Sequence, residues 1–213
     1  MKGDARMQAP SRFGRDIYAL DTGYPRPVLA AIHLIVEDRR VAIAETGSNY
    51  SLARTLSALR VPGLRADSVD YVVLTRIDLD RDRGAEAMID VFNNARLVDH
   101  PRGVRHMVYS GKVVAGAAAA CGEAEVRRLH GDIVPIEEHQ IIPAMHGLRV
   151  DLAGREHQGM HGTIRALWIA GVARSLQATS SGCLTANSIP TGGSSFSRRQ
   201  LECSSIRERC SPR

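Results

Sequence analysis

Apolar runs separated by turn residues dominate the first half of the chain. Four of them are short or rich in branched residues, as buried strands are: Ile17–Leu20, Val28–Val36, Val41–Ala44 and Tyr71–Leu74. Charged residues at 37–40 separate the second run from the third and predict a hairpin turn. Residues 49–59 carry leucines at helical spacing, and Pro62-Gly63 marks the end of that helix. The pattern of strand, turn, helix and strand predicts an α/β fold.

The same alternation continues to about Arg155. The pattern predicts helices at 85–92, 104–109 and 124–129, strands at 95–99, 132–136 and 148–152, and a buried helical turn at the small apolar residues 113–120. His100-Pro101 forms a turn after the strand that begins at Ala95. A chain of 213 residues that keeps one pattern over this length is most simply one domain.

Composition excludes several classes of protein. No run approaches the ~18 apolar residues that a membrane span needs, and residues 1–16 lack the apolar core of a signal peptide. We therefore expect a cytoplasmic protein without a membrane partner. The net charge is +5, but the arginines are dispersed and aromatic content is only 4%, which disfavours a nucleic-acid partner. The four cysteines lack CxxC spacing, so neither a zinc knuckle nor a redox pair is predicted.

Charged residues crowd one loop, Thr75-Arg76-Ile77-Asp78-Leu79-Asp80-Arg81-Asp82-Arg83-Gly84. The loop lies between the predicted strand 71–74 and the predicted helix 85–92, and α/β folds place their sites at such strand ends. It resembles the metal-binding loop of the metallo-β-lactamase superfamily, which reads Thr-His-x-His-x-Asp-His-x-Gly. Thr75, Asp80 and Gly84 fit that frame, whereas the three histidine positions hold Arg76, Asp78 and Arg81.

A second motif supports the same resemblance. Glu45-Thr46-Gly47 follows the strand 41–44 and is similar to the Asp-Thr-Gly turn with which this superfamily supports its metal loop. An ordinary strand-to-helix turn, with Gly47 allowing the bend and Ser48 or Asn49 capping the helix, explains these residues equally well. The resemblance covers residues 17–155 and implies the αββα four-layer sandwich of the superfamily, with its C-terminal half incomplete.

The resemblance implies a hydrolase with two zinc ions that directs water at an ester, thioester, lactone or lactam bond of a small molecule. Asp80 would be the catalytic residue, as a metal ligand that also assists the water, and Asp78 would be the other metal ligand. Arginine has no lone pair to give to a metal, so Arg76 and Arg81 cannot replace histidine ligands. Carboxylates suit magnesium, calcium or manganese better than zinc. We therefore expect this chain not to bind stoichiometric zinc, although its relatives hold two zinc ions.

Two other interpretations of the loop compete with this one. The first needs no metal, and the second needs a different metal. The three arginines of the loop can pair with Asp78, Asp80 and Asp82 in a metal-free cluster, which would make the chain an inactive remnant or a binding module. The three aspartates also resemble the start of an EF-hand loop, but its glycine comes one residue late and Ile89 stands where a glutamate is required. His33, His100 and His106 are expected to be packing or surface residues.

The chain changes character after Arg155. The superfamily's Thr-Pro-Gly-His and Thr-Gly-Asp motifs are missing, and the last residues are rich in Ser, Thr, Gly, Arg and Cys without periodicity. Codons can be chosen for residues 157–164 and 175–190 so that the shifted frame spells Pro-Gly-His and Thr-Gly-Asp. We therefore interpret the C-terminal part as frameshifted. The predicted organisation is a flexible N-terminus (1–16), a truncated metallo-β-lactamase-like domain (17–172) and an irregular or disordered tail (173–213).

Overall fold

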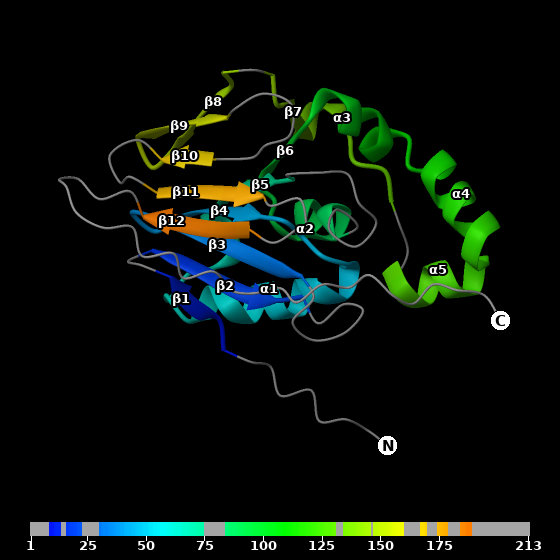
Figure 1. Cartoon of the computed structure of the whole chain (residues 1–213), viewed down its shortest axis with the longest axis horizontal. Helices are drawn as coiled ribbons and strands as arrows, with labels where there is room; N and C mark the ends of the chain where they lie inside the picture. Colours follow the sequence, from blue (N-terminus) through cyan, green and yellow to red (C-terminus); the bar gives the residue numbers. More distant parts are fainter. Residues whose placement is uncertain are drawn as a thin grey trace.

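A computed structural model describes residues 9–13, 16–22, 30–74, 84–130, 134–145, 147–159, 167–169, 174–178 and 184–188. Its centre is a seven-stranded sheet whose strands lie side by side in chain order (Figure 1). The strands are β1 (Ser11–Phe13), β2 (Ile17–Asp21), β3 (Ala31–Glu37), β4 (Arg40–Ala44), β5 (Val69–Val73), β6 (Arg96–Asp99) and β7 (Ile141–Pro143). β1 to β4 pair antiparallel, and β4 to β7 pair parallel.

Helices make the crossovers that parallel strands require. The 3₁₀ turn η1 (Asn49–Ser51), helix α1 (Leu52–Arg60) and η2 (Ala66–Ser68) join β4 to β5, and α2 (Ala85–Val91) lies between β5 and β6. Three helices, α3 (Pro101–Val108), α4 (Gly111–Cys121) and α5 (Glu123–His130), followed by η3 (Glu138–Gln140), lie between β6 and β7. The crossovers bring the carboxyl ends of β4, β5 and β6 to one edge, hereafter the carboxyl edge.

One face of the sheet carries the main core. Alternate strand residues such as Ile32, Ile43 and Leu97 are fully buried there against Met88 of α2 and Met107 of α3. Burial of apolar side chains of this size contributes roughly 1.5–3 kcal/mol each. The period-2 pattern of the strands therefore fixes which side of the sheet the helices cover.

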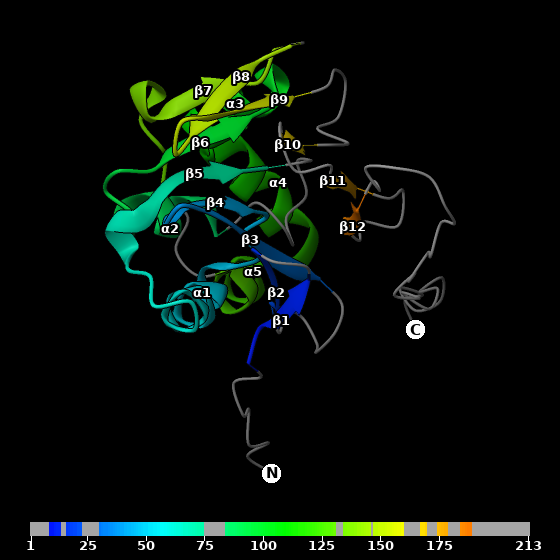
Figure 2. The ribbon, with the colours of Figure 1, turned by 90° about the vertical axis from the view of Figure 1, so that its left-hand side faces the viewer.

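The opposite face of the sheet meets a second, five-stranded antiparallel sheet. Its strands are β8 (Arg149–Leu152), β9 (Arg155–Gly159), β10 (Leu167–Ile169), β11 (Arg174–Ala178) and β12 (Leu184–Ser188). Leu152 of β8 packs with Ile35 and Ala42, and Val150 packs with Val73 and Val98. Helices α1 and α2 and the second sheet thus lie on opposite sides of the first sheet (Figure 2), which is a layered mixed α/β architecture.

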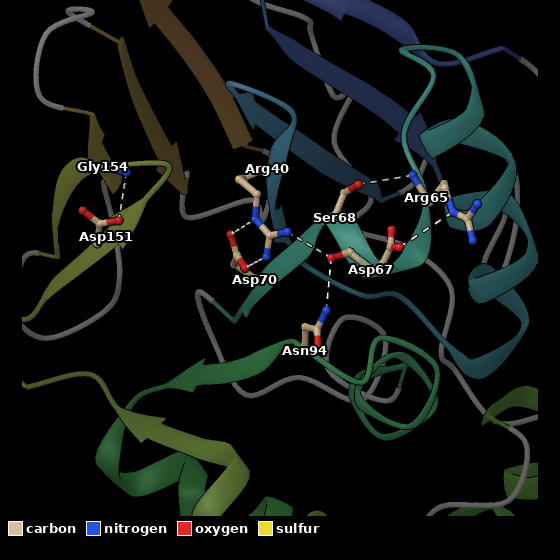
Figure 3. A network of polar contacts seen from close by, with 8 residues as sticks. All are labelled: Arg40, Arg65, Asp67, Ser68, Asp70, Asn94, Asp151 and Gly154. Carbon is tan, nitrogen blue, oxygen red and sulfur yellow. Dashed lines mark hydrogen bonds and ion pairs between the residues drawn. The ribbon is translucent and has the colours of Figure 1, made fainter.

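A polar network lies at the amino ends of β4 and β5, opposite the carboxyl edge (Figure 3). The Arg40 guanidinium makes a two-pronged contact with the Asp70 carboxylate, with Nε donating to Oδ2 at 2.7 Å. The carbonyl oxygen of Asp67 accepts from Arg40 Nη1 at 3.1 Å and from Asn94 Nδ2 at 3.2 Å. This network ties the starts of two parallel strands to the turn before β6.

Most predicted elements are confirmed with shifted ends, but two predictions are wrong. The helical turn at 113–120 is the middle of α4, and it is not buried: Ala115, Gly116, Ala119 and Ala120 are exposed and Val114 is half-buried. Residues 134–136 form no strand; the Ile136 amide instead donates to the Met107 carbonyl of α3 at 3.1 Å. The last parallel strand is β7, five residues later.

In the described part of the chain, no helix has both the length and the apolar character needed to cross a membrane. The strands β11 and β12 fall inside the 173–213 range, and the division into an N-terminus, a domain and a tail stays a prediction.

Candidate functional site

Two backbone hydrogen bonds fix the chain on either side of the charged loop. Just before it, the Leu74 amide donates to the Val98 carbonyl at 2.9 Å, which ties the end of β5 to β6. Just after it, the Gly84 amide donates to the Gly47 carbonyl, also at 2.9 Å. Leu74 and Gly84, the described residues on either side of positions 75–83, therefore both lie at the carboxyl edge, which is where α/β folds place binding sites.

The turn that follows β4 holds the second of these anchors. The Glu45 amide donates to the Val73 carbonyl at 2.9 Å, so the turn is also tied to β5. Glu45 (φ 67°) and Gly47 (φ 66°) both adopt the left-handed conformation, which costs a non-glycine residue roughly 1–2 kcal/mol. A side chain at Gly47 would lie 2.5 Å from Ser51 Oγ, so glycine is required there.

Buried polar side chains surround this turn. Glu45, Thr46 and Ser48 are each at most 2% exposed. The Ser51 hydroxyl lies 3.3 Å from both the Ser48 amide, from which it accepts, and the Thr22 carbonyl, to which it donates. The predicted turn with glycine at the bend is confirmed, and these contacts make it a rigid support beside the loop anchors.

Asp99 is a carboxyl at the same edge that the sequence pattern did not single out. It ends β6, is 0% exposed, and its Oδ1 accepts from the His100 amide at 2.7 Å. Its Oδ2 has no hydrogen-bond partner among the described residues and lies against the backbone of Gly103. Burial raises the pKa of Asp99 to about 7, against the smaller lowering effect of the His100 amide. The signal in the sequence that could have indicated Asp99 is its position as an acidic residue directly after the apolar pair Leu97-Val98.

His100 caps helix α3. Its Nδ1 accepts from the Arg102 amide at 3.1 Å, and Pro101 fills the first helical position, where its missing N–H costs nothing. His100 and His106 are therefore helix-end and surface residues. His33 is a buried strand residue whose Nδ1 has no partner among the described residues, and burial lowers its pKa to about 4.

The predicted site residues Asp78 and Asp80, with Arg76 and Arg81, lie outside the described residues. Among the residues that are described, no group of three or more His, Cys, Asp or Glu side chains could hold a metal ion. Whether zinc fits the loop depends on which of its side chains can act as metal ligands. Two carboxylates without a histidine suit one hard divalent cation, whereas arginines at histidine positions would repel a zinc pair. The residues do not fit a binuclear zinc centre.

No protein-family model and no curated protein matches the sequence. Solved structures do match the fold. A mutant of the FEZ-1 metallo-β-lactamase from Legionella gormanii is 15% identical, with a TM-score of 0.57, over 80% of this chain and 62% of its own. A subclass B3 metallo-β-lactamase from a soil metagenome, MEM-A1, is 13% identical, with a TM-score of 0.54, over 84% of this chain and 61% of its own.

A metallo-β-lactamase from Cronobacter sakazakii described by its HARLDQ motif is 15% identical, with a TM-score of 0.53, over 72% of this chain and 54% of its own. The chain thus spans only 54% to 62% of the length of these three structures. The seven-stranded sheet, the helices that cover one face of it and the structural matches agree with the resemblance found in the sequence. The chain has the metallo-β-lactamase fold.

Proposed function

We propose that the chain is a metal-dependent hydrolase that directs water at an ester, thioester, lactone or lactam bond of a small molecule. The observation that carries the proposal is the pair of backbone hydrogen bonds, Leu74 to Val98 and Gly84 to Gly47, which fix the residues on either side of positions 75–83 at the carboxyl edge of a metallo-β-lactamase fold. In this proposal Asp80 is a metal ligand and assists the attacking water, and Asp78 is a second oxygen ligand.

The cation in this proposal is a single hard ion such as Mn²⁺ or Mg²⁺. Carboxylate oxygens are the preferred ligands of these ions, and they do not need the histidines that zinc prefers. When bound, such an ion polarises a carbonyl and activates water. The protein's own part is to hold two carboxylates on a loop whose ends are fixed by Leu74 and Gly84.

One matched structure supports a departure from the usual metal motif. The Cronobacter sakazakii protein is described by the motif HARLDQ. Aligned with Arg76-Ile77-Asp78-Leu79-Asp80-Arg81, it shares the Leu-Asp pair and has arginine where this chain has Asp78. A metallo-β-lactamase with arginine inside this motif favours the proposal that the fold tolerates altered loops.

The second candidate is a metal-free binding module with the same fold. The observation that favours it is the arginine content of the loop: Arg76, Arg81 and Arg83 can neutralise Asp78, Asp80 and Asp82 without a cation. In that case the three aspartates would have no free oxygen pair for a metal.

Metal content and hydrolysis separate the two candidates. Full-length protein would be dialysed against Mn²⁺, Mg²⁺ or Zn²⁺, and bound metal and hydrolysis of 4-nitrophenyl acetate and nitrocefin would be measured. The proposal predicts about one Mn²⁺ per chain and turnover that EDTA abolishes. Asp80→Asn should lose both, while Asp90→Asn, at an exposed position of α2, should lose neither. If the unmodified chain shows no bound metal and no turnover, the binding module is favoured instead.

A separate part of the proposal concerns the C-terminal residues and the gene that encodes them. We propose that the residues after Arg155 are frameshifted, because Pro-Gly-His and Thr-Gly-Asp can both be recovered, in order, in one alternative frame. Sequencing the gene tests this directly. Codons that spell neither motif in the shifted frame would rule the frameshift out, while leaving the loop proposal unaffected.

A further inference from the structure

Three side chains that carry or can carry positive charge share one face of helix α3. Arg102, Arg105 and His106 are spaced at i, i+3 and i+4, so they lie next to one another on the helix surface, and all three are exposed. The other side of the helix is buried through Gly103 and Met107. We refer to Arg102, Arg105 and His106 as the α3 cationic face.

No acidic side chain neutralises the α3 cationic face within the described residues. The sequence has no Asp or Glu between Asp99 and Glu123, and Asp99 itself is fully buried. The segment that packs on the end of α3 carries Glu137 and Glu138, but Glu137 is within 3.1 Å of His139. None of the ion pairs in the described part of the chain involves Arg102, Arg105 or His106.

The α3 cationic face is also rigid and close to the carboxyl edge. Helix α3 begins two residues after Asp99, at the end of the strand that anchors Leu74. Its first turn is fixed by the His100 cap and by the packing of Gly103 on the Asp99 carboxyl. Figure 1 shows α3, α4 and α5 curving around one end of the sheet, and the Tyr50 hydroxyl joins α5 back to η1 through the Arg127 carbonyl at 3.3 Å. Arg102 therefore comes three residues after Asp99, which ends β6 at the carboxyl edge, and its backbone is held in place.

We propose that the α3 cationic face binds a carboxylate or phosphate group of the substrate, so that the hydrolase prefers anionic esters or amides to neutral ones. Two guanidinium groups one helical turn apart can grip anionic oxygens through paired N–H donors, which a lysine pair would do less specifically. This inference rests on the proposed function for its substrate, but the binding itself does not require turnover or metal. Arg102 and Arg105 are assigned here as specificity residues and take no part in bond cleavage.

The test is a titration of the full chain with small anions, followed by amide chemical shifts, in the presence of EDTA so that no metal can hold the anion. The probes are hippurate, its uncharged amide hippuramide, and phenyl phosphate. We expect hippurate or phenyl phosphate to bind at least tenfold more tightly than hippuramide, with the largest amide shifts at residues 102–108. The tighter of the two anions identifies the group that the face prefers.

Matched variants separate a local site from overall charge. Arg102→Gln/Arg105→Gln should weaken anion binding about tenfold. The control variant Arg60→Gln/Arg96→Gln removes the same charge from exposed positions at the other end of the sheet. It should change the affinity for the anion less than twofold. Equal binding of hippurate, phenyl phosphate and hippuramide, shifts outside α3, or equal loss in both double variants would overturn the inference.

Failure of the proposed function gives a different result. If the chain binds hippurate at α3 but hydrolyses no ester, the anion site is supported and the proposed hydrolase function is wrong. If the chain hydrolyses neutral 4-nitrophenyl acetate as fast as the anionic mono-4-nitrophenyl glutarate, the hydrolase function is supported and the proposed role of the anion site in substrate preference is wrong.

Discussion

The amide of Gly84 donates a hydrogen bond to the carbonyl oxygen of Gly47 at 2.9 Å, and neither glycine has room for a side chain. A Cβ on Gly84 would lie 2.7 Å from the Thr46 carbonyl oxygen and 2.9 Å from that of Ser48. Both obstacles are backbone atoms, which cannot rotate away. The contact therefore joins the turn after β4 to the start of α2 only when residue 84 is glycine.

Gly84→Ala should lower the free energy of unfolding by about 1–3 kcal/mol, because the added methyl must push two backbone segments apart. Urea denaturation measures the change. Gly116→Ala is the matched control, since nothing lies within 4 Å of a Cβ at that position of α4. It should be neutral or stabilising by up to about 1 kcal/mol, as expected for alanine inside a helix. Equal effects of the two substitutions would contradict the close contact at Gly84.

Gly103→Ala should destabilise the protein by a similar amount, about 1–3 kcal/mol, because its Cβ would overlap the Asp99 carboxyl and lie 2.6 Å from Asp99 Cγ. This clash, unlike the one at Gly84, is with a side chain. Asp99→Ala should therefore relieve part of the cost, and a double-mutant cycle measures the relief. Strict additivity of the two substitutions would show that the cost of alanine at residue 103 does not arise from contact with Asp99.

Asp99 should make the protein less stable as the pH rises from about 4 to about 7. Its pKa is raised by burial to about 7 in the folded chain, from an ordinary 3.8, so in this window the folded state holds a proton that the unfolded state has lost. Stability then falls with rising pH, by up to about 4 kcal/mol. Asp99→Asn cannot titrate and should remove this contribution, so that stability no longer falls over this window in urea unfolding at a series of pH values.

His33 should produce the opposite slope. Burial lowers its pKa to about 4 from an ordinary 6.5, so between these values the unfolded state takes up a proton that the folded state does not. Stability then rises with pH through this window, by up to about 3 kcal/mol. In the unmodified chain, the pH dependences of stability that come from Asp99 and His33 nearly cancel. His33→Leu should expose the falling slope of Asp99, and Asp99→Asn the rising slope of His33; a variant pair with identical pH profiles would refute the assignment.

The Arg40 and Asp70 pair should contribute only modestly to stability. Their side chains are 37% and 22% exposed, so water and salt weaken the attraction. A double-mutant cycle of Arg40→Met and Asp70→Asn should give a coupling of about 0.5–1 kcal/mol that shrinks in 1 M NaCl. Arg40→Lys should lose most of it, since lysine cannot make the two-pronged contact with the carboxylate. A coupling that salt leaves unchanged would indicate a desolvated pair.

Short-range pattern predicted much of the fold. The hairpin of β3 and β4, helix α1, strand β5 and helix α2 follow directly from periodicity and turn residues, because each is decided by its own sequence. The apolar residues of α4 predicted burial, but burial depends on a packing partner, and the described structure places little over this helix. Residues 134–136 have strand composition, yet the Met107 carbonyl takes the Ile136 amide.

The candidate site was predictable only in outline. The charged loop after β5 and the turn at Glu45 could be identified from their order along the chain. The role of Asp99 could not, because its burial depends on Gly103, which folds back onto it from the following helix. The sequence predicted a helix only from residue 104, so it did not place Arg102 on one helix face with Arg105 and His106. Only tertiary structure shows that this face is exposed and that the described residues leave it without a counter-ion.

The two anchors of the charged loop are bonds between main-chain atoms, and this has a consequence for how the protein can change over generations. The Leu74–Val98 and Gly84–Gly47 bonds are indifferent to the side chains of residues 75–83. Selection for these two bonds therefore constrains the ends of the loop and sets no requirement on the side chains at positions 75–83. Histidines can be lost from such positions, or returned to them, without removing either bond.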